Sequence, residues 1–556
     1  MPETPSKEAE KSPEKSSDHV APSAWSPFRH SLFAIMWTAT MVSLVGTWMN
    51  DIASGWLMAE MTSSPTWVAL VQSAVSLPIF LFALPAGALA DLVDRKKVLA
   101  IMQTFSALVA FSLWWVVYTG GITPPTLLMF AFLLGTGASF IFPCWMAIIP
   151  QLVPKDKMQP AVALHSVAVN SARTIGPAIG GIVIALWGVS YPFLINGCTF
   201  VLAVMGILWC WKRLVDVRPT NLPTERFFAA MRAGVRFARS SAPLQATLIN
   251  AFAYFAVASV YWALLPLIAR DLLKGGPELY GNLMAGLGIG ALLAALIMPT
   301  LRARFGMNKM VGGATALTSV AIAMFAIARE PLLGIIAALF CGGTWLLVVA
   351  SFNVAAQVAL PEWVRGRGLA VLQMVYFGTF ATASFIWGRT AEAIGIRGAL
   401  GIAAVLSIAI VGVLVKWRLG ITDRPDLTPS GHWIEPVVAH DQGIEKDQGP
   451  VMVTMEYVVK PDDKIPFMAA MTELAQIRRR DGAYSWGVYE DTSTPGTYLE
   501  AFYLESWIEH LRQHERITNA DREVEDKVRQ YHQGKDRPRA KHFLAPKVPG
   551  RADDAG

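Results

Sequence analysis

Apolar runs of about 20 residues recur through the first three quarters of this 556-residue chain. A helix of that length crosses roughly 30 Å of hydrocarbon and pairs its own backbone polar groups. Only 16% of the residues are charged, whereas a soluble domain carries roughly 25%. These features predict an all-α polytopic membrane protein. We expect twelve spans, at about 30–60, 67–89, 98–118, 126–149, 161–186, 190–211, 244–268, 281–300, 310–328, 332–354, 368–390 and 397–415.

Lys and Arg concentrate in alternate loops between these runs. If the N-terminus is cytoplasmic, the five inner loops are rich in these cations and the first three outer loops contain none. The positive-inside rule then places both chain ends in the cytoplasm. Membrane-flanking cations account for much of the net charge of +6, so no nucleic-acid partner is implied. The four cysteines lie in or beside apolar runs and are interpreted as small buried hydrophobes, with no metal or cofactor expected.

The turn after the second run has the pattern Gly87-x-Leu89-x-Asp91-x-x-x-Arg95-Lys96. This pattern resembles the signature between helices 2 and 3 of the major facilitator superfamily. The resemblance implies a twelve-helix fold in a bacterial inner or plasma membrane, with a charge cluster that latches the cytoplasmic gate against helix 11. Two positions depart from the signature, because Leu92 replaces a common Arg and Asp94 a common Gly. These changes predict a weaker or differently built latch.

The two halves of the membrane part repeat each other. Gln151-Leu-Val-Pro154 follows the fourth run, and Gln357-Val-Ala-Leu-Pro361 follows the tenth. Such parallel repeats fit two six-span halves with a substrate site between them. The predicted divisions are a disordered cytoplasmic tail (1–26), an N-terminal half (27–211), a cytoplasmic inter-half loop (212–243), a C-terminal half (244–418), a linker (419–449), a soluble domain (450–546) and a last tail (547–556). The inter-half loop contains either an amphipathic helix or a solvated linker.

The fifth run contains Gly176, Pro177, Gly180 and Gly181. The glycines permit close helix packing, and the Gly-Pro-x-x-Gly-Gly pattern resembles the motif of facilitators that export by proton antiport. Arg173, earlier in this run, is expected to be paired or to face a cavity, since a charge inside a membrane is costly. The alternative is that it snorkels toward the outer surface.

Proton antiport needs a carboxylate within the membrane, and Asp51 is the best candidate, with Arg173 as a possible partner. The alternative is a carboxylate at the end of a helix. The fourth run resembles part of another antiporter motif, but Ala131 occupies the position of that motif's Arg. This difference leaves the proton relay open.

The predicted cavity residues have amide or aromatic side chains that suit a bulky, partly apolar ligand. Runs seven and ten supply most of them by the family resemblance, and core packing is the alternative for each. These candidates are Asn50, Asn170, Asn250, Tyr254, Tyr261, Trp262, Trp345 and Asn353.

The segment after the linker changes character. Apolar residues alternate over 451–459, which predicts a strand, and repeat with helical spacing over 467–475. Two further strands flank Thr494-Pro-Gly496, a helix begins at Ser506, and a last strand lies near 542–544. The order βαββαβ predicts a ferredoxin-like α+β domain. This domain resembles the antibiotic-biosynthesis monooxygenases, and the whole chain resembles the transmembrane secretion effector branch of the facilitators.

The resemblance implies a secondary active exporter of a small, partly hydrophobic molecule, either a siderophore or a drug-like compound, by proton antiport. The expected partners are this molecule and the lipid bilayer, and dimerisation through the C-terminal domain is open. The alternative is a membrane-tethered enzyme with monooxygenase-like activity in that domain. Trp507, His510 and His514 share one helix face and are the residues that suggest it. The protein is expected to be a transporter and not an enzyme.

Overall fold

The structure is a computed structural model that describes residues 25–213, 227–420, 426–433 and 448–546. Several predicted segments lie wholly or partly outside these ranges. They are most of the N-terminal tail (1–24), part of the inter-half loop (214–226), two parts of the linker (421–425 and 434–447) and the last tail (547–556).

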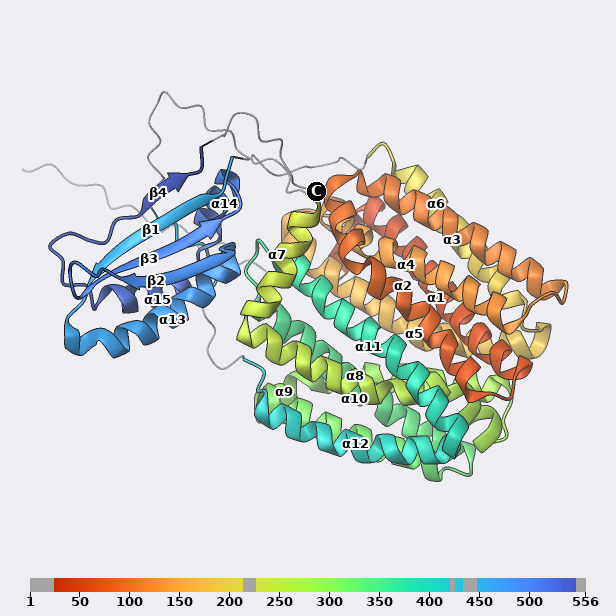
Figure 1. Cartoon of the computed structure of the whole chain (residues 1–556). Coiled ribbons are helices and arrows are strands. Elements are labelled where there is room, and N and C mark those ends of the chain that lie inside the picture. Colours follow the sequence, from red (N-terminus) through yellow and green to blue (C-terminus); the bar gives the residue numbers. More distant parts are fainter. Residues whose placement is uncertain (1–24, 214–226, 421–425, 434–447, 547–556) are drawn as a thin grey trace, which may run out of the picture.

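The membrane part is a bundle of long helices (Figure 1). Among the described residues, eleven helices are long and apolar enough to span a membrane. One of them, α9, turns at Gly306, where φ is +74°, and therefore contains two spans. The prediction of twelve spans is confirmed. The helices are α1 (Ser31–Met61), α2 (Pro65–Leu92), α3 (Arg95–Tyr118), α4 (Pro124–Leu152), α5 (Met158–Trp187), α6 (Tyr191–Cys210), α8 (Ala242–Leu267), α9 (Pro277–Ile327), α10 (Pro331–Ala359), α11 (Arg365–Ile394) and α12 (Ile396–Lys416).

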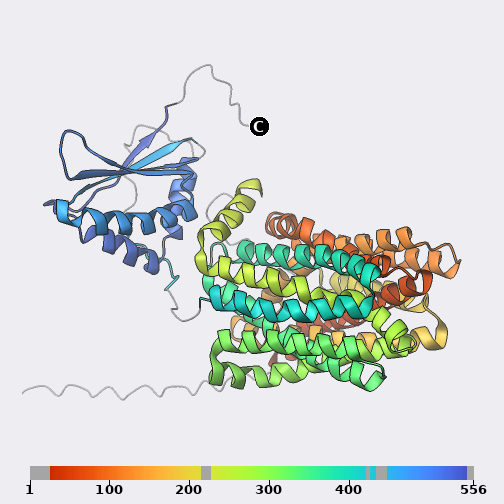
Figure 2. The ribbon, with the colours of Figure 1, turned by 60° about the horizontal axis from the view of Figure 1, so that its bottom comes forward.

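The bundle consists of two halves, an N-terminal half of α1–α6 and a C-terminal half of α8–α12. The halves meet mainly where α5 packs on α9 and α2 packs on α11. Because the helices alternate in direction, α1, α3 and α5 begin at the end nearer the C-terminal domain. We call this the proximal end and the opposite one the distal end (Figure 2).

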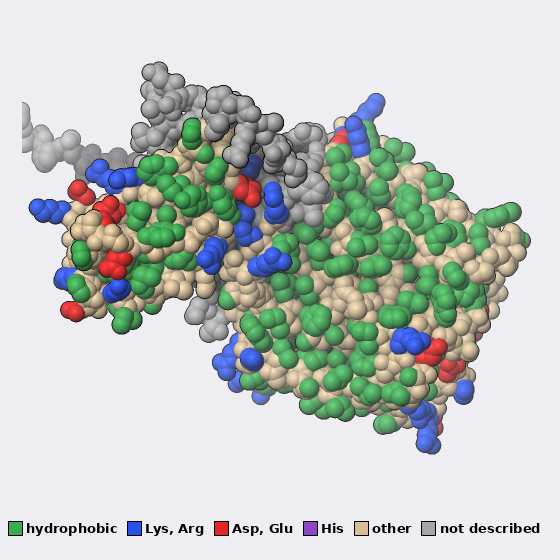
Figure 3. All heavy atoms as spheres, viewed as in Figure 1, with side chains coloured by type: hydrophobic (Ala, Val, Ile, Leu, Met, Phe, Trp, Pro, Cys, Tyr) green, Lys and Arg blue, Asp and Glu red, His purple; other side chains and the backbone are tan. Residues whose placement is uncertain are grey.

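The outer surface of the bundle is apolar. Large hydrophobic side chains are exposed along its length, including Leu296 on α9 and Val405 on α12, which are 73% and 69% exposed. Figure 3 shows hydrophobic side chains over the visible face of the bundle, with Lys and Arg gathered near its ends. Such a surface is stable only against lipid, so this is a multi-pass membrane protein.

The C-terminal domain is a four-stranded antiparallel sheet in the order β2-β3-β1-β4, with helices on one face (Figure 2). The predicted α+β ferredoxin-like fold is confirmed, except that its second helix is broken into two. The break occurs at Ile517–Thr518, where Thr518 and Asp521 form a capping box that starts α15. The elements are β1 (Val451–Val458), α13 (Lys464–Asp481), β2 (Ser485–Glu490), β3 (Thr497–Leu504), α14 (Trp507–Arg516), α15 (Asn519–Arg529) and β4 (Lys541–Leu544).

A buried ion network holds α13 to the sheet and to α15. The Arg478 guanidinium donates to Glu500 at 3.2 Å and to Glu525 at 2.7 Å, and all three side chains are almost fully buried. Burial alone would raise the pKa of Glu525, but the Arg478 charge and hydrogen bonds from His432 and Trp433 lower it to about 2. The ionised pair is therefore part of the folded domain.

Replacing Glu525 with Gln should destabilise the C-terminal domain by about 3 kcal/mol, because it leaves part of the Arg478 charge uncompensated. The loss should appear as faster amide exchange across 450–546 in the full-length protein. Because the folded pKa of Glu525 is depressed, its contribution is present above pH 4.5 and is lost as the pH falls toward 2. The difference from wild type should shrink over that window. Glu515→Gln, at an exposed position on α14, is the control, and equal exchange in both variants would contradict the account.

A short helix, α7 (Phe227–Ser240), lies between the bundle and the C-terminal domain (Figure 2). Its Phe237 packs edge-on against Trp363, just before α11, at 5.9 Å between ring centroids. The domain adds two cations to these rings, Arg480 at 5.5 Å from Phe237 and Arg516 at 4.6 Å from Trp363. Of the two alternatives for the inter-half loop, the helix is present, and its described contacts attach the C-terminal domain to the helix bundle.

Candidate functional site

Arg173 is the central feature of the interior between the halves. It lies 15 residues into α5, about four turns from the proximal end of that helix. Its guanidinium carbon is 5.9 Å from the ring centroid of Trp262 on α8. The ionisable groups that interact with it electrostatically are the phenols of Tyr376 and Tyr261. The predicted charge within α5 therefore faces the opposite half rather than lipid.

The Arg173 guanidinium is poorly satisfied. Its Nε and Nη2 atoms are buried and make no hydrogen bond with any residue that the structure describes. The ion pair proposed between Arg173 and Asp51 is not among the described contacts. A buried cation without a counter-ion is unfavourable, so this group is prepared to receive an anionic or oxygen-rich partner.

Aromatic rings of the C-terminal half surround this cation. Trp262 lies 5.5 Å from Trp345, Trp345 lies 5.7 Å from Tyr376, and Trp48 of the N-terminal half lies 6.4 Å from Trp262, all between ring centroids. We refer to these residues as the central cluster. It comprises Arg173, Trp48, Tyr261, Trp262, Trp345 and Tyr376.

The central cluster has two further polar atoms without described partners, the Tyr261 hydroxyl and the Trp262 Nε1. Aromatic faces bind flat or apolar groups, and the few polar atoms among them fix the orientation of a ligand. Together with Arg173 they can hold a partly aromatic or apolar compound with an acceptor group. Donors left unpaired in the protein would be satisfied by that compound.

Not all of the predicted cavity residues lie in this cluster. Tyr261, Trp262 and Trp345 do. Asn170 and Asn353 donate to carbonyls of their own helices, and Asn250 donates to the carbonyls of Ala246 and Trp417, which ties α8 to the end of α12.

Tyr254 borders the central cluster, because its ring centroid lies 6.1 Å from that of Trp345, whereas Asn50 is on α1 next to Asp51. The Tyr254 hydroxyl is 3.5 Å from Thr318 of α9, and the Asn50 side chain is buried with its Oδ1 unpaired. Trp48 and Tyr376 were not predicted. The sequence feature that could have identified them is that each is an aromatic residue midway along a predicted span, 30–60 for Trp48 and 368–390 for Tyr376.

Asp51 lies within the membrane part and not at a helix end. It is ten residues before the end of α1, or about 15 Å along the helix axis. Its side chain is half-buried, and it interacts with Asn50 on its own helix and with Tyr280 of α9 in the opposite half. Asp51 thus lies at the contact between the halves, distal to the central cluster.

The glycines of the α5 motif provide close contacts on two sides. A Cβ atom at Gly176 would lie 2.6 Å from the Cβ of Trp48, and one at Gly180 would lie 2.9 Å from the Ile52 side chain. The absence of a side chain at both glycines therefore lets α5 pack closely on α1. A Cβ at Gly181 would lie 2.9 Å from the Pro277 carbonyl of α9. Pro177 has no N–H to offer the Arg173 carbonyl four residues earlier, which loosens the helix near the cation. The role of this motif in antiport stays a prediction.

The halves are joined at the distal end by polar contacts that we call the distal seal. Glu392 at the end of α11 accepts hydrogen bonds from Ser64, at 3.2 Å, and from Thr66 at the start of α2. Arg270, after α8, donates to the carbonyl of Ala59 in the last turn of α1 and to that of Thr62 just after it. Because each contact joins one half to the other, these contacts must break for the distal end to open.

The predicted gating motif lies at the proximal end. Gly87 and Leu89 belong to the last turns of α2, while the Asp91 side chain is outside what the structure describes. Asp94, one of the two departures from the family signature, caps α3 by accepting from the Lys96 N–H at 3.1 Å. Arg95 donates to the Ala147 carbonyl at 3.5 Å, which ties this turn to α4. The gating role of these residues remains a prediction.

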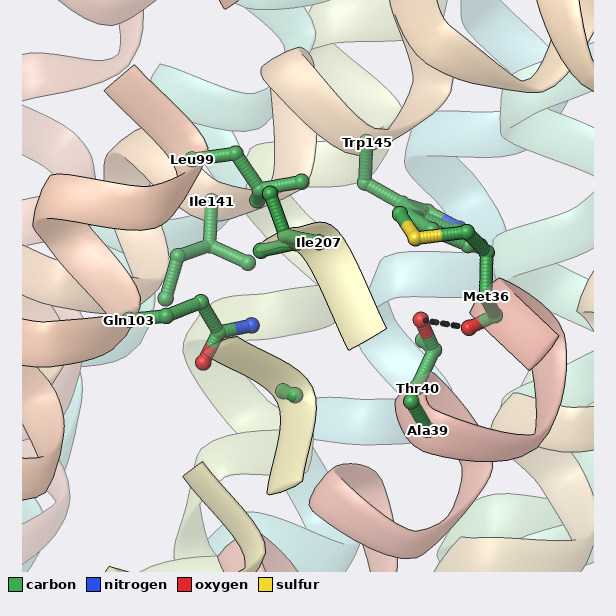
Figure 4. Close-up of a pocket in the computed structure, with 9 residues that line it drawn as sticks. Met36, Ala39, Thr40, Leu99, Gln103, Ile141, Trp145 and Ile207 are labelled. Carbon is green, nitrogen blue, oxygen red and sulfur yellow. Dashed lines mark hydrogen bonds between the residues drawn. The ribbon is translucent and has the colours of Figure 1, made fainter. Parts of the chain in front are cut away.

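A small cavity inside the N-terminal half is a separate feature (Figure 4). Its volume is about 30 Å³, which exceeds the roughly 10–15 Å³ that one water molecule requires. Gln103 projects into it beside Leu99 and Ile141, and the Gln103 Oε1 is buried without a described partner. The cavity can hold a water molecule on Gln103 but is too small for a transported compound. It is lined by Met36, Ala39, Thr40, Leu99, Gln103, Ile141, Trp145, Ala203 and Ile207.

Twelve spans in two six-span halves, with a polar and aromatic cluster between them, define a transporter of the major facilitator type. The transmembrane secretion effector family matches residues 22–549, and the chain belongs to this family. This match confirms the resemblance inferred from the sequence motifs.

Several characterised transporters are similar to this chain. The staphyloferrin A transporter of Staphylococcus aureus is 23% identical over 68% of this chain and 94% of its own length. The multidrug efflux pump Tap of Mycolicibacterium fortuitum is 24% identical over 68% of this chain and 93% of its own. The enterobactin exporter EntS of Escherichia coli is 25% identical over 72% and 96%.

Solved structures share the fold of the membrane part. The nucleoside transporter NupG has a TM-score of 0.58 at 14% identity and covers 70% of this chain and all of its own. A bacterial homologue of the iron transporter ferroportin, in an inward-facing state, has a TM-score of 0.53 at 15% identity, over 70% of this chain and 98% of its own.

Proposed function

We propose that this transporter exports a small, partly hydrophobic compound that carries an anionic or electron-rich oxygen group. The observation that carries this proposal is the buried, unpaired Arg173 guanidinium among aromatic rings. Such a site favours a ligand with both an acceptor and an apolar surface, whether siderophore or drug-like. Relatives named as a siderophore exporter and a multidrug efflux pump support the outward direction.

The proposed orientation places the proximal end and both chain ends in the cytoplasm of a bacterial inner or plasma membrane. Its support is the concentration of cations at that end, including Arg302, Arg304 and Lys309 around the turn in α9. The distal seal would then close the outer side. Export requires the seal to open while the proximal ends of the halves approach each other.

We further propose that protons drive the export and that Asp51 carries them. Asp51 lies about 15 Å along α1 from the distal end of that helix, within the membrane part. A charged carboxylate is costly there and is stabilised by taking up a proton. Its electrostatic interaction with Tyr280 of the opposite half would link the charge of Asp51 to the opening of the distal seal. Opening of the distal seal would expose Asp51 to the outer solution. Closing of the seal would shield Asp51 from that solution again.

Asp51→Asn should abolish export driven by a pH gradient while leaving downhill exchange of the substrate largely intact. The amide cannot release a proton, so the coupled step is lost but the two halves can still move. Transport in reconstituted vesicles, with and without a pH gradient, measures both activities. Glu278→Gln at the distal start of α9 is the matched control. Uphill export at the wild-type rate by Asp51→Asn would place the coupling site elsewhere.

The proposed export can be tested in cells before the substrate is identified. Metabolites inside cells and in the medium would be compared among cells that lack the protein, that contain it, and that contain Arg173→Ala. We expect a compound that accumulates inside the first and third and appears in the medium of the second. A compound that instead enters cells through the wild-type protein would contradict export.

We do not propose catalysis for the C-terminal domain. The histidines that suggested a monooxygenase-like activity fit a metal-binding role better.

A further inference from the structure

Three histidines of the C-terminal domain converge at one edge of its sheet. His510 and His514 are one turn apart on α14, and His542 lies on β4, the edge strand that pairs with β1 (Figure 1). The Nε2 atoms of His510 and His514 are 3.3 Å apart, and the His542 ring centroid is 4.6 Å from that of His510. One nitrogen from each of the three rings lies within 4.8 Å of the others.

These distances fit a metal centre. Zinc binds histidine nitrogens at about 2.0–2.1 Å in a tetrahedron, so two such nitrogens are roughly 3.3–3.4 Å apart. The His510–His514 pair already has this spacing. The third ring would have to shift by at most roughly 1.5 Å to reach this spacing. His542 is on a short edge strand, where such a shift is feasible.

Burial lowers the pKa of all three rings. Burial lowers the pKa of His510 to about 3, with further repulsion from His542 and His514. Burial, together with repulsion from His542, lowers the pKa of His514 to about 4, and burial also lowers the pKa of His542.

The surroundings of the three histidines contain a hydrogen-bond acceptor and aromatic rings of the kind that orient and shield the ligands of a metal site. Gln513 interacts with His510, and both the Gln513 Oε1 and the His510 Nδ1 are buried without a described partner. A small rotation would let the Nδ1–H donate to the amide oxygen, which fixes the tautomer with Nε2 free for a metal. Trp507 packs on His510 at 5.4 Å, and Trp433 packs on His514 at 4.9 Å, so an apolar wall limits access of water.

We propose that His510, His514 and His542 form a binding site for one divalent first-row transition metal ion, with zinc as the reference ion. Three imidazole ligands suit Zn²⁺, Fe²⁺, Ni²⁺ and Cu²⁺ better than Mg²⁺ or Ca²⁺, which prefer oxygen. A fourth position is left for water or an added ligand. The ordinary alternative is that three neutral rings simply pack together, and the experiment must separate the two.

The site is on the same helix as contacts to the transporter body. On α14, Arg516 stacks on Trp363 at 4.6 Å and receives support from Glu509 at 2.8 Å. A metal that joins α14 to β4 would make this helix more rigid. The metal site itself does not depend on the proposed direction or substrate of transport.

The test uses the full-length protein in detergent, purified without a polyhistidine tag and treated with a chelator. Titration with Co²⁺ reports binding through its visible absorption, which intensifies in a tetrahedral site, and Zn²⁺ should then displace the Co²⁺. We expect one ion per chain. His542→Ala and His514→Ala should each weaken binding on the order of 100-fold.

Two further variants sharpen the result. His542→Asp keeps an oxygen ligand and should retain more affinity than His542→Ala. His532→Gln changes a histidine of the same domain outside the cluster and should bind as wild type does. Because His514 and His542 are only partly buried, their replacement leaves the core of the domain intact. Failure of the wild-type protein to bind either ion, or unchanged binding in both Ala variants, would overturn the proposal and leave the rings as packing.

Discussion

Arg173→Ala should almost abolish transport without destabilising the folded protein. The guanidinium is buried and its Nε and Nη2 make no described hydrogen bond, so its removal relieves a desolvation cost rather than breaking a network. The same removal deprives an acceptor group on the substrate of its cation. Losing such a charged contact costs on the order of 100-fold in apparent affinity. Thermal unfolding in detergent should be unchanged or shifted upward.

The variant Arg173→Lys separates charge from shape. Lysine keeps the positive charge but loses the planar group that stacks on Trp262, so transport should be partly retained. Arg304→Ala, at an exposed position near the turn in α9, is the matched control and should transport normally. The measurement is export of the compound identified by the comparison of metabolites. Wild-type export by Arg173→Ala, at normal protein level, would remove this residue from the substrate site.

Cross-linking the distal seal should stop transport completely and reversibly. Thr66 and Glu392 are in contact across the two halves, and cysteines at both positions can be joined by a short reducible bifunctional thiol reagent. A covalent link there prevents the halves from separating, because opening requires this contact to break. Reduction of the link should restore transport to its level before treatment.

The control for this experiment is a cysteine pair within one half. Arg389 and Glu392 lie one turn apart on α11 and contact each other at 3.3 Å, so a link between cysteines at these two positions leaves the halves free. The native residues Cys144, Cys198, Cys210 and Cys341 are replaced in all variants. Continued transport by the cross-linked Thr66–Glu392 pair would show that the distal end does not open.

Most of the fold could be predicted from composition and spacing. Membrane-length runs specify helices because lipid offers the backbone no other partners, and the twelve predicted spans match the described helices. One boundary was not visible. Spans eight and nine are joined without a loop, since helix continues through 300–310 and only the positive φ of Gly306 reverses the chain.

The break between α14 and α15 could have been predicted from the sequence, but it was not. A single helix was predicted from Ser506, whereas α14 ends at Arg516 and α15 starts at Asn519. Thr518 followed three residues later by Asp521 is a capping pattern. Local signals of this kind specify where a helix begins more reliably than periodicity does.

The candidate site was only half predictable. Arg173 could be found because a charge inside an apolar run is costly, and such residues mark functional sites. Its aromatic neighbours come from α8, α10 and α11, roughly 90 to 200 residues further along the chain, and the sequence does not show which rings face it. Asn250 illustrates the opposite error, since a buried amide can serve helix packing as well as a ligand.

The central claim is that the central cluster is exposed alternately at the two ends of the bundle. The most direct measurement is the accessibility of a cysteine at Tyr376, in a protein whose four native cysteines are replaced, to a membrane-impermeant thiol reagent added from either side. Ala403→Cys, fully buried within the C-terminal half, serves as the unreactive control. We predict labelling of Tyr376→Cys from both sides, with outer labelling lost when the distal seal is cross-linked. Labelling from one side only, whatever the state of the seal, would contradict the account.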